Sequence, residues 1–372
     1  MSEVEAPSRP PPDLARLHQT SSPTVPTKLT SDDTSQNQSS KTPGVLRRQL
    51  REQGYIHIPK LLPPHLLLAA QATSKYLVSR TRTGTFWPYV RTVPKQYPPW
   101  PELNLKAPNP DLNIWGVQHL LHPNLTSLRD VYAEIYFSEE VIGVVRELLG
   151  EPDDTTTESS GQDRAAVSDE DLVMELFNLL CSPTKSHDFE LAWHRDDVRP
   201  DVSPDIEEHE LRTKTPGGRQ LHAQYNIALF DDESLIVIPG SHRRVRTQQE
   251  SDATPYQTGL ESEIVVKLQP GDAVFYDSNI LHRGVYKGID EKNELGRMTL
   301  HGSVGLKGYG DERSRQVLQH GVGTWIEKEE AKFSNVQDEG KKRRAETMRQ
   351  ALIDMALFPE LEVVERLVEL SD

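Results

Sequence analysis

Histidine and aspartate, two residue types that bind transition metals, stand two positions apart at His194 and Asp196, directly after an apolar run. Side chains alternate between the faces of a strand, so this pair points to one side and offers an imidazole and a carboxylate to one ion. With 13 histidines in 372 residues, such a pair also arises by chance. A third ligand from elsewhere in the chain is therefore required. Asp197 is the alternative carboxylate if the strand has already broken.

The third ligand is expected from His282, which ends a strand-like run after the turn at 270–272. The intervening chain is long enough for several strands to return to the same end of a barrel. Two histidines and one carboxylate are the ligand set of non-haem Fe(II) oxygenases, which keep open positions for oxygen. A structural zinc site needs a fourth protein ligand, for which the single cysteine, Cys181, is a poor source. We therefore expect His194, Asp196 and His282 to be catalytic metal ligands.

Arg297 and Thr299 follow on one face of a further strand. An arginine inside a barrel is costly without an anionic partner, and its planar fork suits a carboxylate. Thr299 offers a hydroxyl to the same group. A ligand with a carboxylate at one end and a metal-chelating oxoacid at the other would join Arg297 to the iron, and 2-oxoglutarate is such a ligand.

Short strands must position these residues. Runs with strand character, separated by turn signals such as Pro239-Gly240 and Pro270-Gly271, are found at 172–181, 189–194, 220–230, 235–238, 263–268, 273–276, 282–286 and 297–304. Eight short strands at this spacing indicate a sandwich or barrel, and a jelly roll is the natural candidate. Helices are expected before and after these strands, among them 65–80 and a single helix over 128–149 that stops at Gly150.

Composition divides the chain into three parts. Residues 1–43 are rich in Pro, Ser and Thr, and we expect them to be disordered. A catalytic domain is expected over 44–310, with a mobile acidic insertion at 151–171. Residues 311–372 read as a helical C-terminal extension.

The charge of −15 argues against nucleic acid as a partner. No apolar run is long enough for a bilayer, no secretion signal is recognisable, and the one cysteine forms no internal disulfide, so a cytoplasmic protein acting on a small molecule is expected. A local basic pocket around Arg80, Arg82 and Arg91, or around Arg243 to Arg246, could still accept a polyanion. The oligomeric state stays open.

An ordered set of motifs carries a family resemblance. HRD at 194–196, IVIPGSH at 236–242, QPGDAVFYDSNILHRG at 269–284 and RMT at 297–299 resemble the phytanoyl-CoA dioxygenase (PhyH) family over about 45–306. The resemblance implies a mainly β protein with flanking helices, built on a cupin-like double-stranded β-helix, and an enzyme that uses Fe(II), 2-oxoglutarate and O₂. It implies iron ligation by His194, Asp196 and His282, and a cosubstrate site at Arg297. Gln118 and Asn226 fall near positions that face the cosubstrate in relatives.

Several features depart from that pattern or stay open. Gly284 stands where many relatives carry a small hydroxyl residue, and 199–215 form a long acidic excursion expected at the substrate mouth. Arg195 and Asp197 are expected to point outward. The expected reaction is hydroxylation or desaturation; the alternatives are a cupin-like metal-dependent hydrolase or isomerase, and a non-catalytic binding protein on the same barrel.

Overall fold

The structure is a computed structural model, and it describes residues 44–98, 100, 102–109, 112–150, 167–184, 188–289, 296–308, 316–318 and 320–369. The segment 1–43 and residues 151–166 of the expected insertion lie outside the described residues. Thr42–Asp372 form one compact unit. Within the described ranges, no helix has the length and apolar character needed to cross a membrane.

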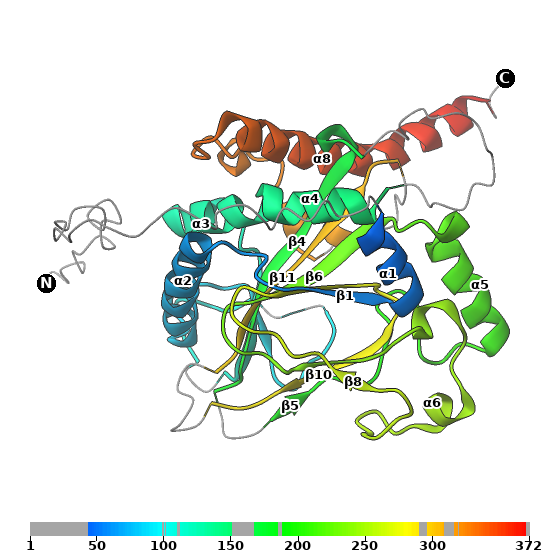
Figure 1. Cartoon of the computed structure of the whole chain (residues 1–372). Helices are drawn as coiled ribbons and strands as arrows, with labels where there is room; N and C mark the ends of the chain where they lie inside the picture. The colour runs from blue at the N-terminus through cyan, green and yellow to red at the C-terminus, as the bar shows by residue number, and fades with distance from the viewer. Residues whose placement is uncertain are drawn as a thin grey trace, which may run out of the picture. The chain divides into compact units, whose positions relative to one another are not determined.

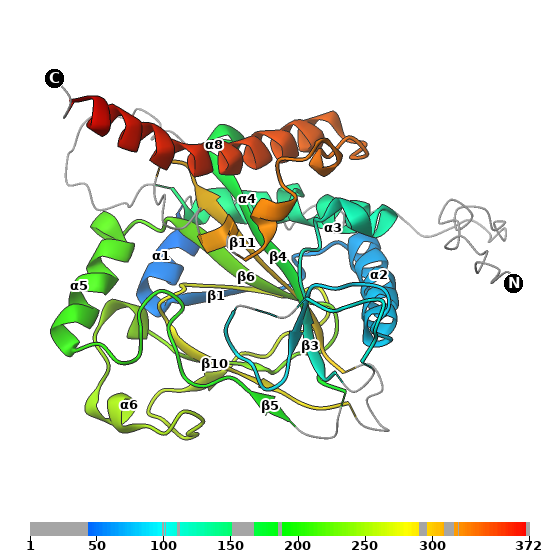
Figure 2. The ribbon, with the colours of Figure 1, turned by 180° about the vertical axis from the view of Figure 1, so that it is seen from behind.

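Two antiparallel sheets make up the β core (Figures 1 and 2). The larger has seven strands in the order β1-β9-β6-β11-β4-β3-β2, and the smaller has four in the order β5-β10-β7-β8. With flanking helices, this is the predicted mainly β jelly roll. The strands are β1 (Tyr55–Ile58), β2 (Val90–Thr92), β3 (Ile114–Val117), β4 (Leu172–Cys181), β5 (Phe189–Glu190), β6 (His222–Ala228), β7 (Leu235–Ile238), β8 (Ile264–Val265), β9 (Ala273–Tyr276), β10 (Leu281–Tyr286) and β11 (Met298–Leu306).

Helices flank these sheets, and local interactions explain where α1 ends and where α3 gives way to α4. The helices are α1 (Val45–Gln53), α2 (Pro64–Arg82), α3 (Ser127–Tyr136), α4 (Glu139–Leu148), α5 (Pro204–Lys214), α6 (Gln248–Asp252) and α8 (Glu339–Glu369). The chain leaves α1 through Gly54, whose φ of 81° is a conformation that glycine adopts without strain. The single helix predicted over 128–149 is wrong. Ser138 is extended and accepts a hydrogen bond from Val141 N, so it ends α3 and caps α4.

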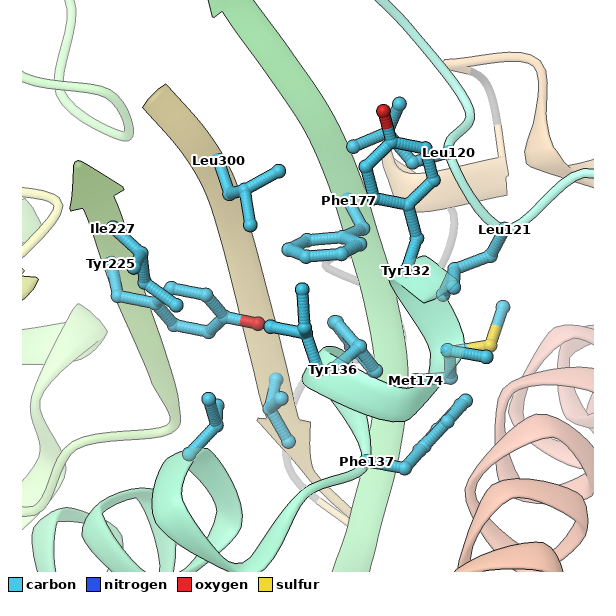
Figure 3. Packing of buried hydrophobic residues seen from close by; sticks show 14 of the residues in the cluster. Leu120, Leu121, Tyr132, Tyr136, Phe137, Met174, Phe177, Tyr225, Ile227 and Leu300 are labelled. Carbon is cyan, nitrogen blue, oxygen red and sulfur yellow. The ribbon is translucent and has the colours of Figure 1, made fainter. Parts of the chain in front are cut away.

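One face of the large sheet packs against α3 and the start of α4, as Figure 3 shows. Phe177, Tyr225 and Leu300 point from neighbouring strands toward Tyr132 and Tyr136. Alternation then turns the intervening residues of the same strands to the opposite face. That opposite face meets the small sheet, and the candidate site lies there.

A β-bulge in β4, where two residues lie opposite Ser303 of β11, is held by a side chain from the helical layer. The Tyr136 hydroxyl donates to Ser303 O at 2.6 Å and accepts from Glu175 N at 2.9 Å. One phenol hydroxyl therefore bonds to the backbones of both strands at the point where their register shifts. α8 adds to this layer by packing on β4, with Met348 and Leu352 fully buried.

Candidate metal centre and its cavity

The two histidines of the expected metal site are a cross-strand pair. His194 N donates to His282 O at 3.0 Å, and His282 N donates to His194 O at 3.1 Å. Residues opposite each other in an antiparallel pair carry their side chains on one face, which explains how positions so far apart in sequence meet. The ring centroids are 4.2 Å apart.

The strand expected over 189–194 is interrupted. β5 covers only Phe189–Glu190, and His194 rejoins the sheet as an isolated bridge. Asp196 is then held by its own backbone, since Asp196 N donates to Ser278 O at 2.8 Å. The two side chains therefore meet because each residue is anchored separately, and not through regular alternation along one strand.

Each imidazole is oriented by a backbone carbonyl two residues before it. His194 Nδ1 lies 2.7 Å from Ala192 O, and His282 Nδ1 lies 2.8 Å from Ile280 O. A carbonyl only accepts, so each Nδ1 carries the proton and each Nε2 keeps a free lone pair. Metal-binding histidines in proteins are fixed in this manner.

Asp196 completes the group with one oxygen already occupied. Gln224 on β6 donates from Nε2 to Asp196 Oδ2 at 2.8 Å. The other oxygen, Oδ1, lies 3.4 Å from His194 Nε2 and 3.7 Å from His282 Nε2. One ligand atom from each of the three residues lies within 4.8 Å of the others, a spacing that a single metal ion spans.

The electrostatics favour an ionised Asp196 carboxyl beside a neutral His282 imidazole. Burial opposes the charge of Asp196, yet His282 and His194 hold the pKa of this carboxyl below its usual range. Burial and the neighbouring His194 lower the pKa of His282 to about 4. At neutral pH the site therefore offers a carboxylate and an unprotonated imidazole, which are the forms that bind cations.

A cavity of about 430 Å³ opens onto these three residues between the two sheets. Its polar lining includes Gln224, Asn226 and His301 from the large sheet. Rings and aliphatic side chains also line it, namely Tyr97, Trp100, Trp115, Leu176, Leu180, Leu191, Leu235, Tyr276 and Tyr286. A volume of this size is at the small end of the range for ligand pockets.

Arg297 lines the cavity, and its anionic partner comes from within the chain. Arg297 Nε and Nη2 donate to Asp232 Oδ2 at 3.2 and 2.9 Å, and Thr299 Oγ1 donates to the same oxygen at 2.6 Å. Asp232 Oδ1 accepts from Ser234 N at 2.9 Å. Burial opposes the charge of Asp232, but Arg297 holds the pKa of the carboxyl below its usual range.

Asp232 occupies only the side edge of the Arg297 guanidinium. Nη1 has no hydrogen-bond partner among the described residues, and the guanidinium carbon lies 4.5 Å above the Tyr286 ring. A guanidinium has five N–H groups, so the end of the fork remains for a second acceptor. The hydroxyl proton of Thr299 is committed to Asp232, so Thr299 does not donate to a ligand in this arrangement.

The two further sequence candidates lie in different places. Asn226 lines the cavity, and its Oδ1 lies 2.9 Å from His301 Nδ1. Gln118 is not part of the cavity lining. It is buried, and its Nε2 faces Val90 O at 3.4 Å.

Two other expectations are wrong. Arg195 does not point outward: it is 3% exposed, pairs with Glu207 Oε1 at 2.9 Å and donates to Ser241 O at 3.0 Å. The excursion 199–215 contains helix α5, and none of its residues is among those lining the metal cavity. Glu207 explains both results, because it ties α5 to the buried Arg195 on the side away from the cavity.

Sequence reasoning missed Asp232 altogether. Asp231, Asp232 and Glu233 are three consecutive acids, and nothing in the sequence distinguishes the one buried carboxylate from its more exposed neighbours. Gln224 had a signal, because it shares a strand face with Asn226. Gly284, noted as a departure, has a physical reason: a Cβ there would lie 2.8 Å from the Tyr286 hydroxyl, which fills the space.

The solved structures that match this chain are distant from it. AviO1 from Streptomyces viridochromogenes Tue57 is 18% identical over 72% of this chain and 96% of that one, with a TM-score of 0.42. EctD from S. alaskensis, solved with 2-oxoglutarate and 5-hydroxyectoine, is 13% identical over 73% and 79%, with a TM-score of 0.44. HygX from Streptomyces hygroscopicus, solved with nickel and 2-oxoglutarate, is 14% identical over 70% and 86%, with a TM-score of 0.41. At these values no residue role is transferred from them.

No curated protein matches the chain. The sequence profile of the phytanoyl-CoA dioxygenase (PhyH) family, in contrast, matches residues 50–285, well over half of the chain. The match spans His194, Asp196 and His282, the three residues that the fold brings together. The chain belongs to the phytanoyl-CoA dioxygenase family and is an iron- and 2-oxoglutarate-dependent oxygenase.

Proposed function

We propose that His194, Asp196 and His282 bind the catalytic Fe(II), and that the free end of Arg297 binds the distal carboxylate of 2-oxoglutarate. The substrate is a small molecule oxidised at a C–H bond. With O₂ as the oxidant, iron and 2-oxoglutarate held here would supply the chemistry: 2-oxoglutarate is converted to succinate and CO₂ with one oxygen atom of O₂, and the other oxygen atom serves to oxidise the substrate. The carboxylate at position 196 favours hydroxylation or desaturation over halogenation, because halogenases keep that position small to admit chloride.

The observation that carries this proposal is that, in each of the three residues, one polar atom is hydrogen-bonded within the protein and another faces the common point. Both Nδ1 atoms and Asp196 Oδ2 are engaged by the protein, which leaves His194 Nε2, His282 Nε2 and Asp196 Oδ1 directed at one point. Three ligands on one side leave the cavity side for the cosubstrate and oxygen. The apolar walls keep water from the reacting atoms.

Two neighbouring groups hold the Arg297 guanidinium in position to bind the cosubstrate. Asp232 and the Tyr286 ring restrain the guanidinium from two sides, so that a ligand carboxylate meets an ordered fork. Asn226 and His301 are the neutral polar groups of the wall. Burial and the nearby Arg91 lower the pKa of His301 to about 3, so it acts there as a neutral hydrogen-bonding group.

The test is turnover of 2-oxoglutarate to succinate by protein reconstituted with Fe(II), using matched variants. His282→Ala and Asp196→Ala should abolish turnover, whereas His242→Ala, which removes a buried histidine outside the cavity, should retain it. Metal uptake without 2-oxoglutarate binding would instead favour Lewis-acid chemistry. Wild-type activity in His282→Ala would contradict the assignment.

We also propose a cytoplasmic location. The single cysteine, Cys181, is buried and free, which suits a reducing compartment. Fractionation of cells that make the native protein tests this, and recovery in a secreted or organellar fraction would contradict it.

A further inference from the structure

A second arginine, Arg91, lies in the cavity on β2. It faces Gly116 of β3 in the sheet register, and its stem packs against that glycine so closely that a Cβ at 116 would lie 3.0 Å from Arg91 Cδ. Its guanidinium carbon lies 5.4 Å from the Trp100 ring centroid and 5.3 Å from that of Trp115. Gly116 and the two indole rings therefore hold the Arg91 side chain in one position.

Arg91 differs from the buried arginines in having no acceptor among the residues that the structure describes. The buried arginines of the described ranges each donate to a carboxylate or carbonyl: Arg129 to Lys332 O, Arg195 to Glu207, Arg283 to Glu190, Arg297 to Asp232 and Arg349 to Glu346. Among the described residues, the Arg91 guanidinium makes no hydrogen bond or ion pair, and its Nε is a buried donor without a partner. Removing a cation from water without an anion is costly, so a site like this calls for an external one.

The groups around Arg91 bear on whether its anionic partner comes from the protein, from the cosubstrate or from another ligand. Burial lowers the pKa of Arg91, while Tyr286, Tyr276 and Asp196 act in the opposite direction. Asp196 is the only carboxylate among these, and the metal would take up its charge. Arg297 already provides the cosubstrate with a fork, whereas Arg91 lies along the same wall: Trp115 stacks on Tyr286 at 5.5 Å, and Arg297 lies over Tyr286.

We propose that Arg91 binds the carboxylate of the substrate, so that this oxygenase acts on a small carboxylic acid whose apolar body lies along the Trp100–Trp115–Tyr286 wall. The inference rests on the proposed function, since it names the substrate class of the same site. A cavity of about 430 Å³ that also holds 2-oxoglutarate leaves room for a compact acid and does not enclose a long acyl thioester.

The test uses charge-matched probes on the loaded protein. Acetate, hexanoate and phenylacetate are titrated by calorimetry into protein loaded anaerobically with Fe(II) and 2-oxoglutarate, beside the corresponding amides. A charged hydrogen bond of about 1.5–3 kcal/mol predicts that at least one acid binds roughly ten-fold or more tightly than its amide. If no acid exceeds its amide, the proposal is overturned.

Variants distinguish the substrate from the cosubstrate as the source of the carboxylate. Arg91→Gln should remove the preference for acid over amide and leave 2-oxoglutarate affinity within about two-fold, with Arg91→Lys restoring part of the preference. Arg80→Gln, which changes an arginine packed on Phe86 at the surface of α2, should change neither. If Arg91→Gln weakens 2-oxoglutarate at least ten-fold and spares the acid preference, Arg91 serves the cosubstrate and the proposal is wrong.

The same samples separate this inference from the proposed function. The visible charge-transfer absorption of the Fe(II)–2-oxoglutarate complex reports the metal centre alone. If that absorption forms and no acid binds, only the substrate assignment fails. If it does not form, the proposed function fails. Unchanged thermal unfolding of Arg91→Gln shows that a loss of preference is not a loss of fold.

Discussion

Arg297 and Arg91 lie along the same aromatic wall and make opposite use of their charge. Arg297 is neutralised by Asp232, is 6% exposed and shares its partner with Thr299. Within the part of the chain that the structure describes, Arg91 packs against two indole rings and a glycine and has no ion-pair partner. The ion pair with Asp232 holds Arg297 in one orientation, so Arg297 is part of the fixed structure of the site. Arg91 has its charge available for a ligand, so we assign it to substrate selectivity.

The largest expected difference between the two arginines is in stability. Arg297→Gln leaves Asp232 buried and unpaired, which should lower the free energy of unfolding by about 3–5 kcal/mol. Arg91→Gln breaks no ion pair and should change it by less than about 1 kcal/mol. Urea unfolding followed by circular dichroism measures both, and equal losses would remove the distinction.

The pH dependence of the Arg297–Asp232 pair follows from the lowered pKa of Asp232. A carboxyl whose pKa is lower in the folded than in the unfolded state adds stability above its unfolded pKa of about 3.9, and this is lost as the pH falls through the folded value. Asp232→Asn should therefore be less stable than wild type by about 2–3 kcal/mol at pH 7. The gap should narrow below about pH 4. Urea midpoints measured across this range test the sign, and a gap that widens in acid would contradict it.

Replacing either of two glycines by alanine should lower stability less than the changes at Arg297 and Asp232, and the two variants can be compared with each other. Gly284→Ala places a Cβ against the Tyr286 ring and hydroxyl at 2.9 and 2.8 Å, and should cost about 1–3 kcal/mol because that ring is packed on both sides. Gly116→Ala meets the flexible stem of Arg91 at 3.0 Å. It should cost less stability but weaken binding of the preferred acid several-fold. Thermal unfolding of the two variants measures the loss of stability, and calorimetry measures their affinity for the acid. Unchanged acid affinity in Gly116→Ala would show that the contact between Gly116 and Arg91 is not needed for binding.

The smallest effect is expected from Tyr286→Phe. The ring beneath Arg297 and beside Trp115 is kept, and an arginine–aromatic contact of this kind depends on the ring face. Stability and 2-oxoglutarate affinity should change by less than about 1 kcal/mol. A larger change in either would assign a direct role to the hydroxyl.

The sequence predicted the parts of this site that depend on residue type and strand order. His194, Asp196 and His282 were expected together and are together, although the strand before His194 is broken and the pairing with His282 places it. The jelly roll followed from repeated short strands and turns. These features are determined by local patterns and by one long-range pairing.

What could not be predicted depends on which polar groups become buried. Asp232 and Glu207 look like ordinary surface acids in the sequence, yet each partners a buried arginine. The break at Ser138 was missed because the apolar spacing continues through it. Burial is a property of the assembled fold, and the charge at a single position does not reveal it.

The most direct test of the central claim is an anaerobic titration of the purified protein with Fe(II) and 2-oxoglutarate, followed by visible absorption. The account predicts a charge-transfer band that saturates at one iron per chain, is absent in His282→Ala and persists in Arg91→Gln. A band of full intensity in His282→Ala, or no band in the wild-type protein, would contradict it.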